Sequence, residues 1–143
     1  MDYRLVEQVL RLAFDAGRYR NYTLADIDAC IFSAIRHDKA LTWFNDKGLC
    51  GLLTWCFLPP DRANLFLSKT HALLYNDFAS NDGELIMVDF LAPYGETTRM
   101  VREARKHMAM LYGHGIEGRW KRPWREQPKL GKALTRGNAH EHS

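Results

Sequence analysis

The chain has 143 residues, a length that fits a single domain with its own hydrophobic core. Apolar residues make up 46% of it and charged residues 26%, which is ordinary for a globular protein and argues against wholesale disorder. No run of 18 or more apolar residues is present, and the N-terminal segment MDYRLVEQVL does not have the pattern of a signal peptide. The composition therefore predicts a globular protein without a membrane-spanning helix.

The cysteines indicate the cellular environment of the protein, and the charge distribution indicates what kind of partner it binds. Cys30, Cys50 and Cys56 are odd in number and match no zinc spacing, so we interpret them as buried apolar residues of a cytoplasmic protein without a metal site. The net charge is only +3, but residues 116–136 carry seven Lys or Arg against two Glu. This stretch predicts a basic surface for an acidic protein or nucleic acid. Nucleic acid is the weaker candidate because no nucleic-acid-binding motif is present.

The first half of the chain predicts two helices and a hairpin. Apolar residues recur at helical spacing over residues 2–16, and Gly17 is a suitable stop. A second helix is predicted to begin near Thr23, with Asp26 completing a variant of the capping box. The segments ALTWFND and LCGLLTWCFLPP then predict a hairpin. Its second arm is almost entirely apolar, as in a central strand that is covered on both faces.

The second half predicts alternating helices and strands. Residues 61–79 favour a helix, ELIMVDFLAP a strand, and Glu96 to Tyr112 a helix that Gly113 ends. GIEGRWKRPW predicts a short last strand. The helix is expected to direct these residues inward: Met100, Val101, Ala104, Met108 and Leu111. The whole order predicts one α/β domain over residues 1–130, with a mixed central sheet flanked by helices, and a flexible tail over residues 131–143.

The segment VDFLAPYGE, residues 88–96, is the first candidate site. In open α/β sheets, ligands bind beyond the carboxyl ends of strands, where the next helix offers unpaired N–H groups and a positive dipole end. Gly95 would let a ligand approach the backbone closely, and phosphate or pantetheine amides suit such a place. The segment has no series of spaced glycines, so an ordinary helix start is the better explanation of these residues by themselves.

Asp89 is the second candidate. A carboxylate within an apolar strand must be paired, solvated at a cleft or protonated, because an isolated buried charge is very costly. In a site, Asp89 could orient a base or act as the base itself. In a purely structural role it would accept hydrogen bonds from a neighbouring donor.

Several segments together resemble the toxin-activating lysine acyltransferases, the hemolysin-type activators. MVDFLAPYGE is similar to the family segment Ile-Asp-Trp-Ile-Ala-Pro-Phe-Gly, and residues 20–22 (RNY) to an Arg-Asn-Trp segment. Residues 49–57 fit the family's apolar strand with an internal tryptophan, and residues 78–82 fit its Trp-Thr-Ser-Gly-Asp turn. These pieces keep the family order over roughly residues 10–120.

The resemblance implies a GNAT-like fold and transfer of a fatty acyl group from acyl carrier protein to lysines of a protoxin. The thioester arm would lie between splayed central strands, near the Asp89 strand and the next helix. The resemblance implies no tightly bound cofactor. The acyl-phosphopantetheine thioester, carried by acyl carrier protein or by CoA, is instead the expected donor of the acyl group. A homodimer is also implied. The residues expected to hold the arm are Ala92, Gly95, Glu96 and Thr97.

Two positions depart from the family pattern. The histidine that the family pairs with its aspartate is Tyr19 here, and the serine upstream of it is Ala16. A phenol titrates at about pH 10 and is a poor base at neutral pH, but it can donate to a developing oxyanion. Asp89 and Tyr19 are therefore the expected catalytic residues. The alternative is a catalytically silent binding protein, such as a phage-type effector, that modulates a host enzyme handling acyl or CoA thioesters.

One further surface admits two interpretations. Arg99, Arg102, Arg105 and Lys106 fall on one predicted helix. They are either a solvated helix face or a patch that grips the carboxylates of a carrier protein or the phosphates of a ligand.

Overall fold

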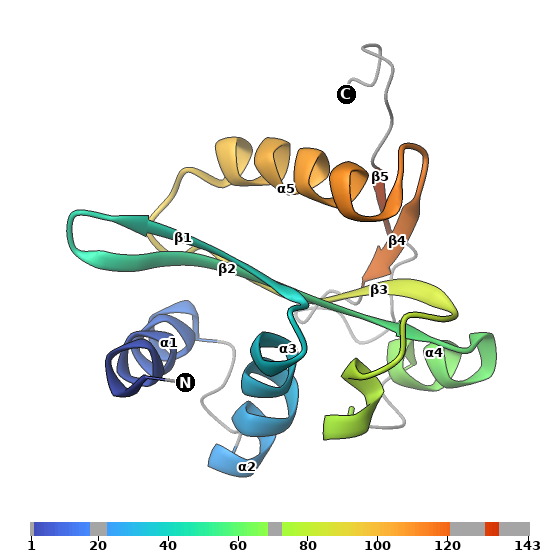
Figure 1. Cartoon of the computed structure of the whole chain (residues 1–143). Helices are drawn as coiled ribbons and strands as arrows, with labels where there is room; N and C mark the ends of the chain where they lie inside the picture. The colour runs from blue at the N-terminus through green and yellow to red at the C-terminus, as the bar shows by residue number, and fades with distance from the viewer. Residues whose placement is uncertain (1, 18–22, 69–72, 121–130, 135–143) are drawn as a thin grey trace.

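Five strands form one mixed sheet in the order β1-β2-β3-β4-β5 (Figure 1). The computed structural model describes residues 2–17, 23–68, 73–120 and 131–134, the last range by its backbone alone. Neighbouring strands are antiparallel except β3 and β4, which are parallel and are joined by helix α5 (Thr97–Tyr112). The strands are β1 (Ala40–Asn45), β2 (Gly48–Leu58), β3 (Glu84–Leu91), β4 (Glu117–Trp120) and β5 (Gly131–Leu134).

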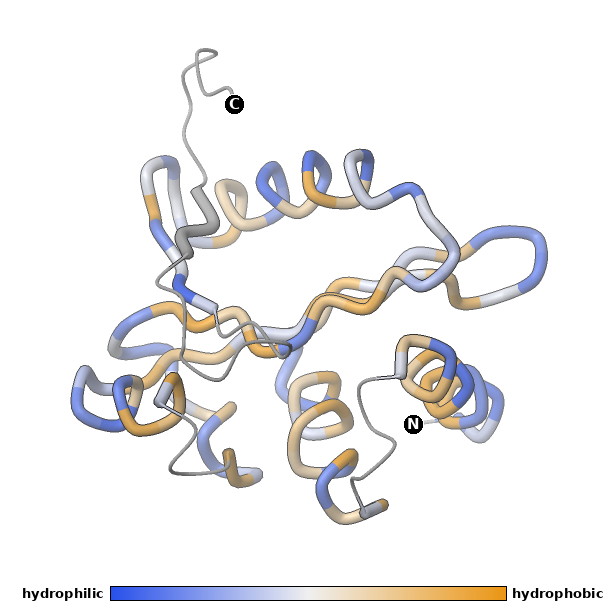
Figure 2. The backbone as a smooth tube through the Cα atoms, turned by 180° about the vertical axis from the view of Figure 1, so that it is seen from behind, coloured by the Kyte–Doolittle hydropathy of each residue, from blue (hydrophilic) through white to orange (hydrophobic). Residues whose placement is uncertain are grey.

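The helices cover the two faces of the sheet unequally. Helix α5 lies alone on one face, and the remaining helices lie on the other (Figure 1). Hydrophilic and hydrophobic residues alternate along α5, as expected for a helix with one buried side (Figure 2). This arrangement confirms the predicted α/β class with a mixed sheet flanked by helices. The opposite layer consists of α1 (Tyr3–Ala16), α2 (Leu24–Ile27), η1 (Asp28–Phe32), α3 (Ser33–Arg36), α4 (Pro60–Leu67) and η2 (Tyr75–Phe78).

Local signals in the sequence fix the ends of the first two helical segments. Helix α1 begins where the Asp2 carboxylate accepts from the Arg4 N–H at 2.7 Å, and it ends at Gly17, whose φ is 72°. The next segment begins with the reciprocal capping box of Thr23 and Asp26. Both predicted starts and the predicted stop are confirmed.

The prediction of one helix over residues 61–79 is wrong. Helix α4 ends at Leu67, and Leu74 is extended, with φ −114° and ψ 163°. The Asp77 carboxylate caps a separate 3-10 turn by accepting from the Leu74 N–H at 2.6 Å, and it also pairs with Arg62 at 2.6 Å. Apolar periodicity at steps of three and four does not distinguish two short turns from one helix.

The core consists of three apolar clusters. Two of them lie on the helix-rich face of the sheet, and the third lies on the α5 face. Strand β2 is buried along nearly its whole length, which confirms its prediction as a central strand. On the helix-rich face, the α1 cluster includes Leu12, Leu52 and Leu91, and the α4 cluster includes Cys56 and Val88. The α5 cluster on the other face includes Trp55, Met87, Met100 and Met108. Two of the residues predicted to point inward from α5 do not: Val101 is partly exposed and Leu111 is 46% exposed.

The C-terminal part agrees with the sequence over β4 and differs after it. Strand β4 confirms the short strand predicted within GIEGRWKRPW, but it is not the last strand. Strand β5 occupies the first four residues of the segment that the sequence predicts as a tail. The division into a domain over residues 1–130 and a tail over residues 131–143 otherwise stays a prediction. Within the described ranges, no helix combines the length and the apolar character needed to cross a membrane.

One buried charge makes stability depend on pH. The Lys39 side chain is 4% exposed, and its ammonium donates to the Phe78 carbonyl at 2.6 Å. Burial lowers the pKa of Lys39 from 10.5, an effect that Cys56 and Asp38 partly oppose. The unfolded chain therefore binds this proton more tightly than the folded chain, and the folded state gains stability as pH rises through the lowered pKa toward 10.5.

We expect this gain to appear when the free energy of unfolding in urea is measured for the wild type and for Lys39→Met. The stability of the wild type relative to the variant should increase with pH from neutral toward 10.5. Burial also raises the pKa of the Cys56 thiol, but that contribution is common to both proteins and largely cancels in the difference. The matched control is Lys47→Met, which makes the same change at an exposed position. A difference that stays constant for Lys39→Met would contradict the prediction.

Candidate active site

A β-bulge in β3 decides which face of the sheet carries Asp89. Between β2 and β3, Thr54 pairs with Asp89 and Trp55 pairs with Met87, which leaves Val88 as an extra residue in β3. Strict alternation would place Asp89 on the face of Met87, toward α5. The extra residue instead places Asp89 on the same face as Thr54, because directly paired residues share a face. Asp89 therefore lies on the side of α1 and α3.

Asp89 is a buried polar residue at the boundary between two apolar clusters. It is 5% exposed, and Thr54 opposite it is fully buried. On β2, Leu52 on one side of this pair belongs to the α1 cluster, and Cys56 on the other side belongs to the α4 cluster. The polar pair thus occupies the line along which the two clusters meet, a position that an apolar residue would fill in an uninterrupted core.

Among the described residues, the pairing of β3 with β4 extends to within two residues of Asp89. Leu85, Ile86 and Met87 pair with Gly118, Arg119 and Trp120 in parallel. Asp89 follows the last of these pairs by two residues, toward the carboxyl end of β3. This is the end at which open α/β sheets bind ligands.

The turn between β3 and α5 is open and has unusual backbone angles. Gly95 has φ 102°, and Glu96, the residue before α5, has φ 64° without a side-chain cap. Apart from its chain neighbours, no heavy atom of the described residues lies within 4 Å of the place that a Cβ of Gly95 would occupy. Among the residues predicted to hold a pantetheine arm, Ala92 packs partly against the α5 cluster, whereas Thr97 is exposed in the first turn of α5.

A hydrogen bond fastens this turn to the end of α1. The Tyr94 hydroxyl donates to the Asp15 carboxylate. This bond is the main cause that raises the pKa of Tyr94 above 10.0, because the carboxylate accepts from the neutral phenol. Asp15 precedes Tyr19 by four residues along the chain. Tyr19 itself lies outside the described residues, so its predicted catalytic role stays a prediction.

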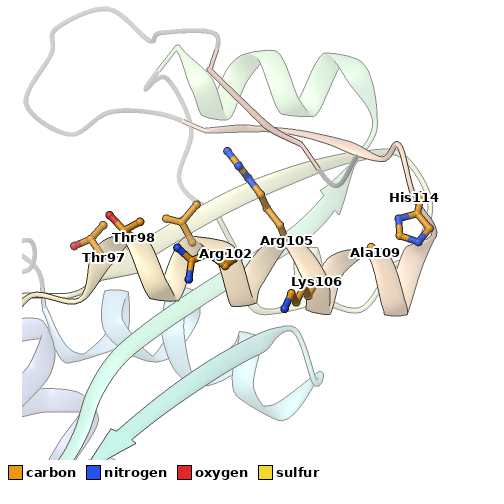
Figure 3. Close-up of a pocket in the computed structure, with 8 residues that line it drawn as sticks. Thr97, Thr98, Arg102, Arg105, Lys106, Ala109 and His114 are labelled. Carbon is orange, nitrogen blue, oxygen red and sulfur yellow. The ribbon is translucent and has the colours of Figure 1, made fainter. Parts of the chain in front are cut away.

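A basic groove runs along the outer side of α5 (Figure 3). Its volume is about 550 Å³, and Thr97 and Thr98 lie at the N-terminal end, with His114 beyond the C-terminal end. The remaining lining residues are Val101, Arg102, Arg105, Lys106 and Ala109.

The positively charged side chains on α5 differ in whether they form ion pairs with acidic side chains. Arg99 pairs with Glu96 at 2.9 Å and with Glu103 at 3.2 Å. A hydrogen bond from the Trp43 indole at 2.9 Å is the largest cause that lowers the pKa of Glu103, followed by the bond from Arg99. Among the described residues, no acidic side chain pairs with Arg102 or Arg105, so these two contribute positive charge to the groove next to the open turn.

The three described histidines lie in different surroundings. The His37 ring lies 4.9 Å from the Tyr75 ring, and the His107 ring lies 6.1 Å from Trp55 on the α5 side. His114 lines the groove, and the other three histidines are outside the described residues. Within the described ranges, no group of three His, Cys, Asp or Glu is arranged to hold a metal ion.

Some of the predicted site residues lie close together in the structure, and others lie on opposite faces of the sheet. Gly95, Glu96 and Thr97 lie together at the start of α5, but Asp89 presents its side chain to the opposite face of the sheet. Two neighbours of the site were not predicted. Thr54 had a signal in the sequence, a single hydroxyl within an apolar strand, whereas Tyr94 had none, because its partner Asp15 is distant in sequence.

A family model matches most of the chain. The chain matches the family model of the RTX toxin acyltransferases (HlyC) over residues 3–127, a range that includes the bulge, the open turn and α5. No curated protein matches the chain. Because the matched range covers most of the 143 residues, the chain belongs to the RTX toxin acyltransferase family.

Proposed function

We propose that the protein transfers an acyl group from an acyl carrier protein or acyl-CoA thioester to the side chain of a protein lysine. Family membership supports acyl transfer in general. The observation that carries the specific proposal is the buried Asp89 carboxylate, which a bulge directs to one face of β3 near the carboxyl end of that strand.

In the proposed reaction, the lysine amine attacks the thioester carbonyl. A carbon–nitrogen bond forms, the carbon–sulfur bond breaks, and the products are an amide and the free thiol of the phosphopantetheine arm. Asp89 accepts the proton that the amine loses, and the departing thiolate is protonated in turn. Tyr19 donates to the oxyanion that develops on the thioester carbonyl.

The backbone around β3 suits the amide-rich arm of the donor. Within the described residues, the part of β3 from Val88 to Leu91 has no parallel partner in β4, and its backbone groups on that edge are suited to the arm's amides. The open turn at Gly95 leaves room for the arm to pass from this edge toward α5.

The basic groove suits the acidic part of the donor. Acyl carrier proteins are acidic and carry a phosphate on the pantetheine arm, so Arg102, Arg105 and Lys106 offer complementary charge. In this proposal the donor approaches from the α5 face and the acceptor lysine from the opposite face, and the two meet at Asp89.

A second function is supported by the replacement of the family histidine by Tyr19. The groove and the open turn could bind a partner without any chemical step. The protein would then be a catalytically silent relative that modulates an enzyme handling acyl or CoA thioesters.

The two functions are separated by intact-mass spectrometry. Wild-type protein is incubated with acyl-carrier-protein and acyl-CoA thioesters of several chain lengths, with a cell lysate and lysine-containing peptides as acceptors. Transfer predicts a mass increment on an acceptor that equals the acyl group and depends on the donor supplied. If no acceptor gains mass while the donor thioesters remain intact, the silent binding function is the better explanation.

A further inference from the structure

Thr54 has a buried hydroxyl that the fold does not use. Its side chain is fully buried, and its Oγ1 has no hydrogen-bond partner in the described part of the chain. Buried polar groups almost always have a partner, so an unpaired hydroxyl requires an explanation. Ser33 shows the usual arrangement, since it is equally buried and its hydroxyl donates to the Asp28 carbonyl at 3.0 Å.

The Thr54 hydroxyl lies on the same face of the sheet as Asp89. The two residues are directly paired across β2 and β3, and such pairs place their Cβ atoms about 5 Å apart on one face. The bulge at Val88 creates this pairing, because without it Asp89 would point toward α5. One structural feature therefore brings a carboxylate and an unpaired hydroxyl together between two apolar clusters.

We propose that the Thr54 hydroxyl accepts a hydrogen bond from the acceptor amine and holds it beside Asp89. This inference rests on the proposed acyl transfer. An amine carries several N–H donors, so it can contact a carboxylate and a hydroxyl oxygen simultaneously when the two are on neighbouring strands. Thr54 then fixes the direction of the nitrogen lone pair toward the thioester carbonyl, while Asp89 takes the proton.

Three variants test the inference by steady-state transfer to a lysine peptide and by thermal unfolding. Thr54→Val removes the hydroxyl and keeps the shape, Thr54→Ser keeps the hydroxyl, and Thr42→Val makes the same change at a partly exposed site on β1. For Thr54→Val we expect a KM for the acceptor that is about 10-fold higher, an unchanged KM for the donor, and a melting temperature at or above that of the wild type. Thr54→Ser should retain most of the activity, and Thr42→Val should match the wild type.

The outcomes distinguish this inference from the proposed function. If the wild type transfers acyl groups and Thr54→Val does so with the same acceptor KM, the inference is overturned and the proposed function stands. If Thr54→Val is destabilised while Thr54→Ser is not, the hydroxyl has a structural role and the inference is again wrong. If the wild type transfers nothing to any acceptor, both the inference and the proposed function fail.

Discussion

Asp89→Asn should reduce acyl transfer by about a hundredfold to ten-thousandfold, the usual contribution of a general base. Asparagine has nearly the shape of aspartate and can still form hydrogen bonds, but it cannot accept the proton that the attacking amine loses. The effect should therefore fall on kcat rather than on the KM of either substrate, since donor and acceptor contacts outside the reacting atoms are retained.

The measurement is the rate of mass gain on the acceptor, determined for wild type and variant with the same donor. Exposed Glu7→Gln on α1 is the matched control, because it makes the same kind of change at a carboxylate on the surface and should keep the wild-type rate. Circular dichroism and thermal unfolding establish that the variant is folded. A folded Asp89→Asn protein that transfers acyl groups at the wild-type rate would exclude Asp89 as the base.

The parts of the fold that sequence predicted are those whose signals are local. The end of α1 depends on Gly17, and the start of α2 depends on Thr23 and Asp26, which lie within the same turn as the groups they cap. The strand that contains Asp89 was also predicted, because apolar residues flank Asp89 on both sides along it. The break after Leu67 was missed, because apolar residues keep the spacing of a helix on both sides of it, and the ion pair that holds Asp77 to Arg62 is not visible in that spacing.

The sequence predicted only part of the site, because the rest depends on contacts between residues that are distant along the chain. A carboxylate in an apolar strand indicated that Asp89 is special, but the face that it occupies depends on the bulge at Val88. A bulge is set by the register between two strands, and the alternation within one strand does not reveal it. The same long-range dependence hides the Tyr94–Asp15 bond, which joins residues 79 positions apart.

The bulge also changes how the proposed reaction is organised. Prediction from the sequence placed Asp89 and the start of α5 at one junction, as if a single ligand group would contact both. With Asp89 on the α1 side and the groove on the α5 side, the proposed donor and acceptor each have their own face. Variants on the two faces should then affect different steps: groove substitutions should alter donor binding, whereas Thr54 and Asp89 should alter the acceptor and the chemical step.

The double variant Arg102→Glu/Arg105→Glu should weaken binding of acyl carrier protein by about 10-fold to 100-fold. Neither side chain has an ion pair in the described part of the chain, so their reversal breaks no internal contact there, and it replaces attraction of an acidic partner by repulsion. Binding of the wild type should weaken as salt is added, and this dependence should be smaller for the variant. Titration calorimetry at low and high salt measures both effects.

The decisive comparison uses two donors and a control of equal charge. Arg4→Glu/Lys47→Glu changes the net charge by the same amount at exposed positions outside the groove, and it should bind the carrier protein almost as the wild type does. The groove variant should also transfer normally from a short acyl-pantetheine, which lacks the carrier protein, because the Asp89 side of the sheet is unchanged. Equal loss with both donors would place the groove residues in the fold or the chemical step. Equal loss in both double variants would show that overall charge, and not the groove, attracts the carrier protein.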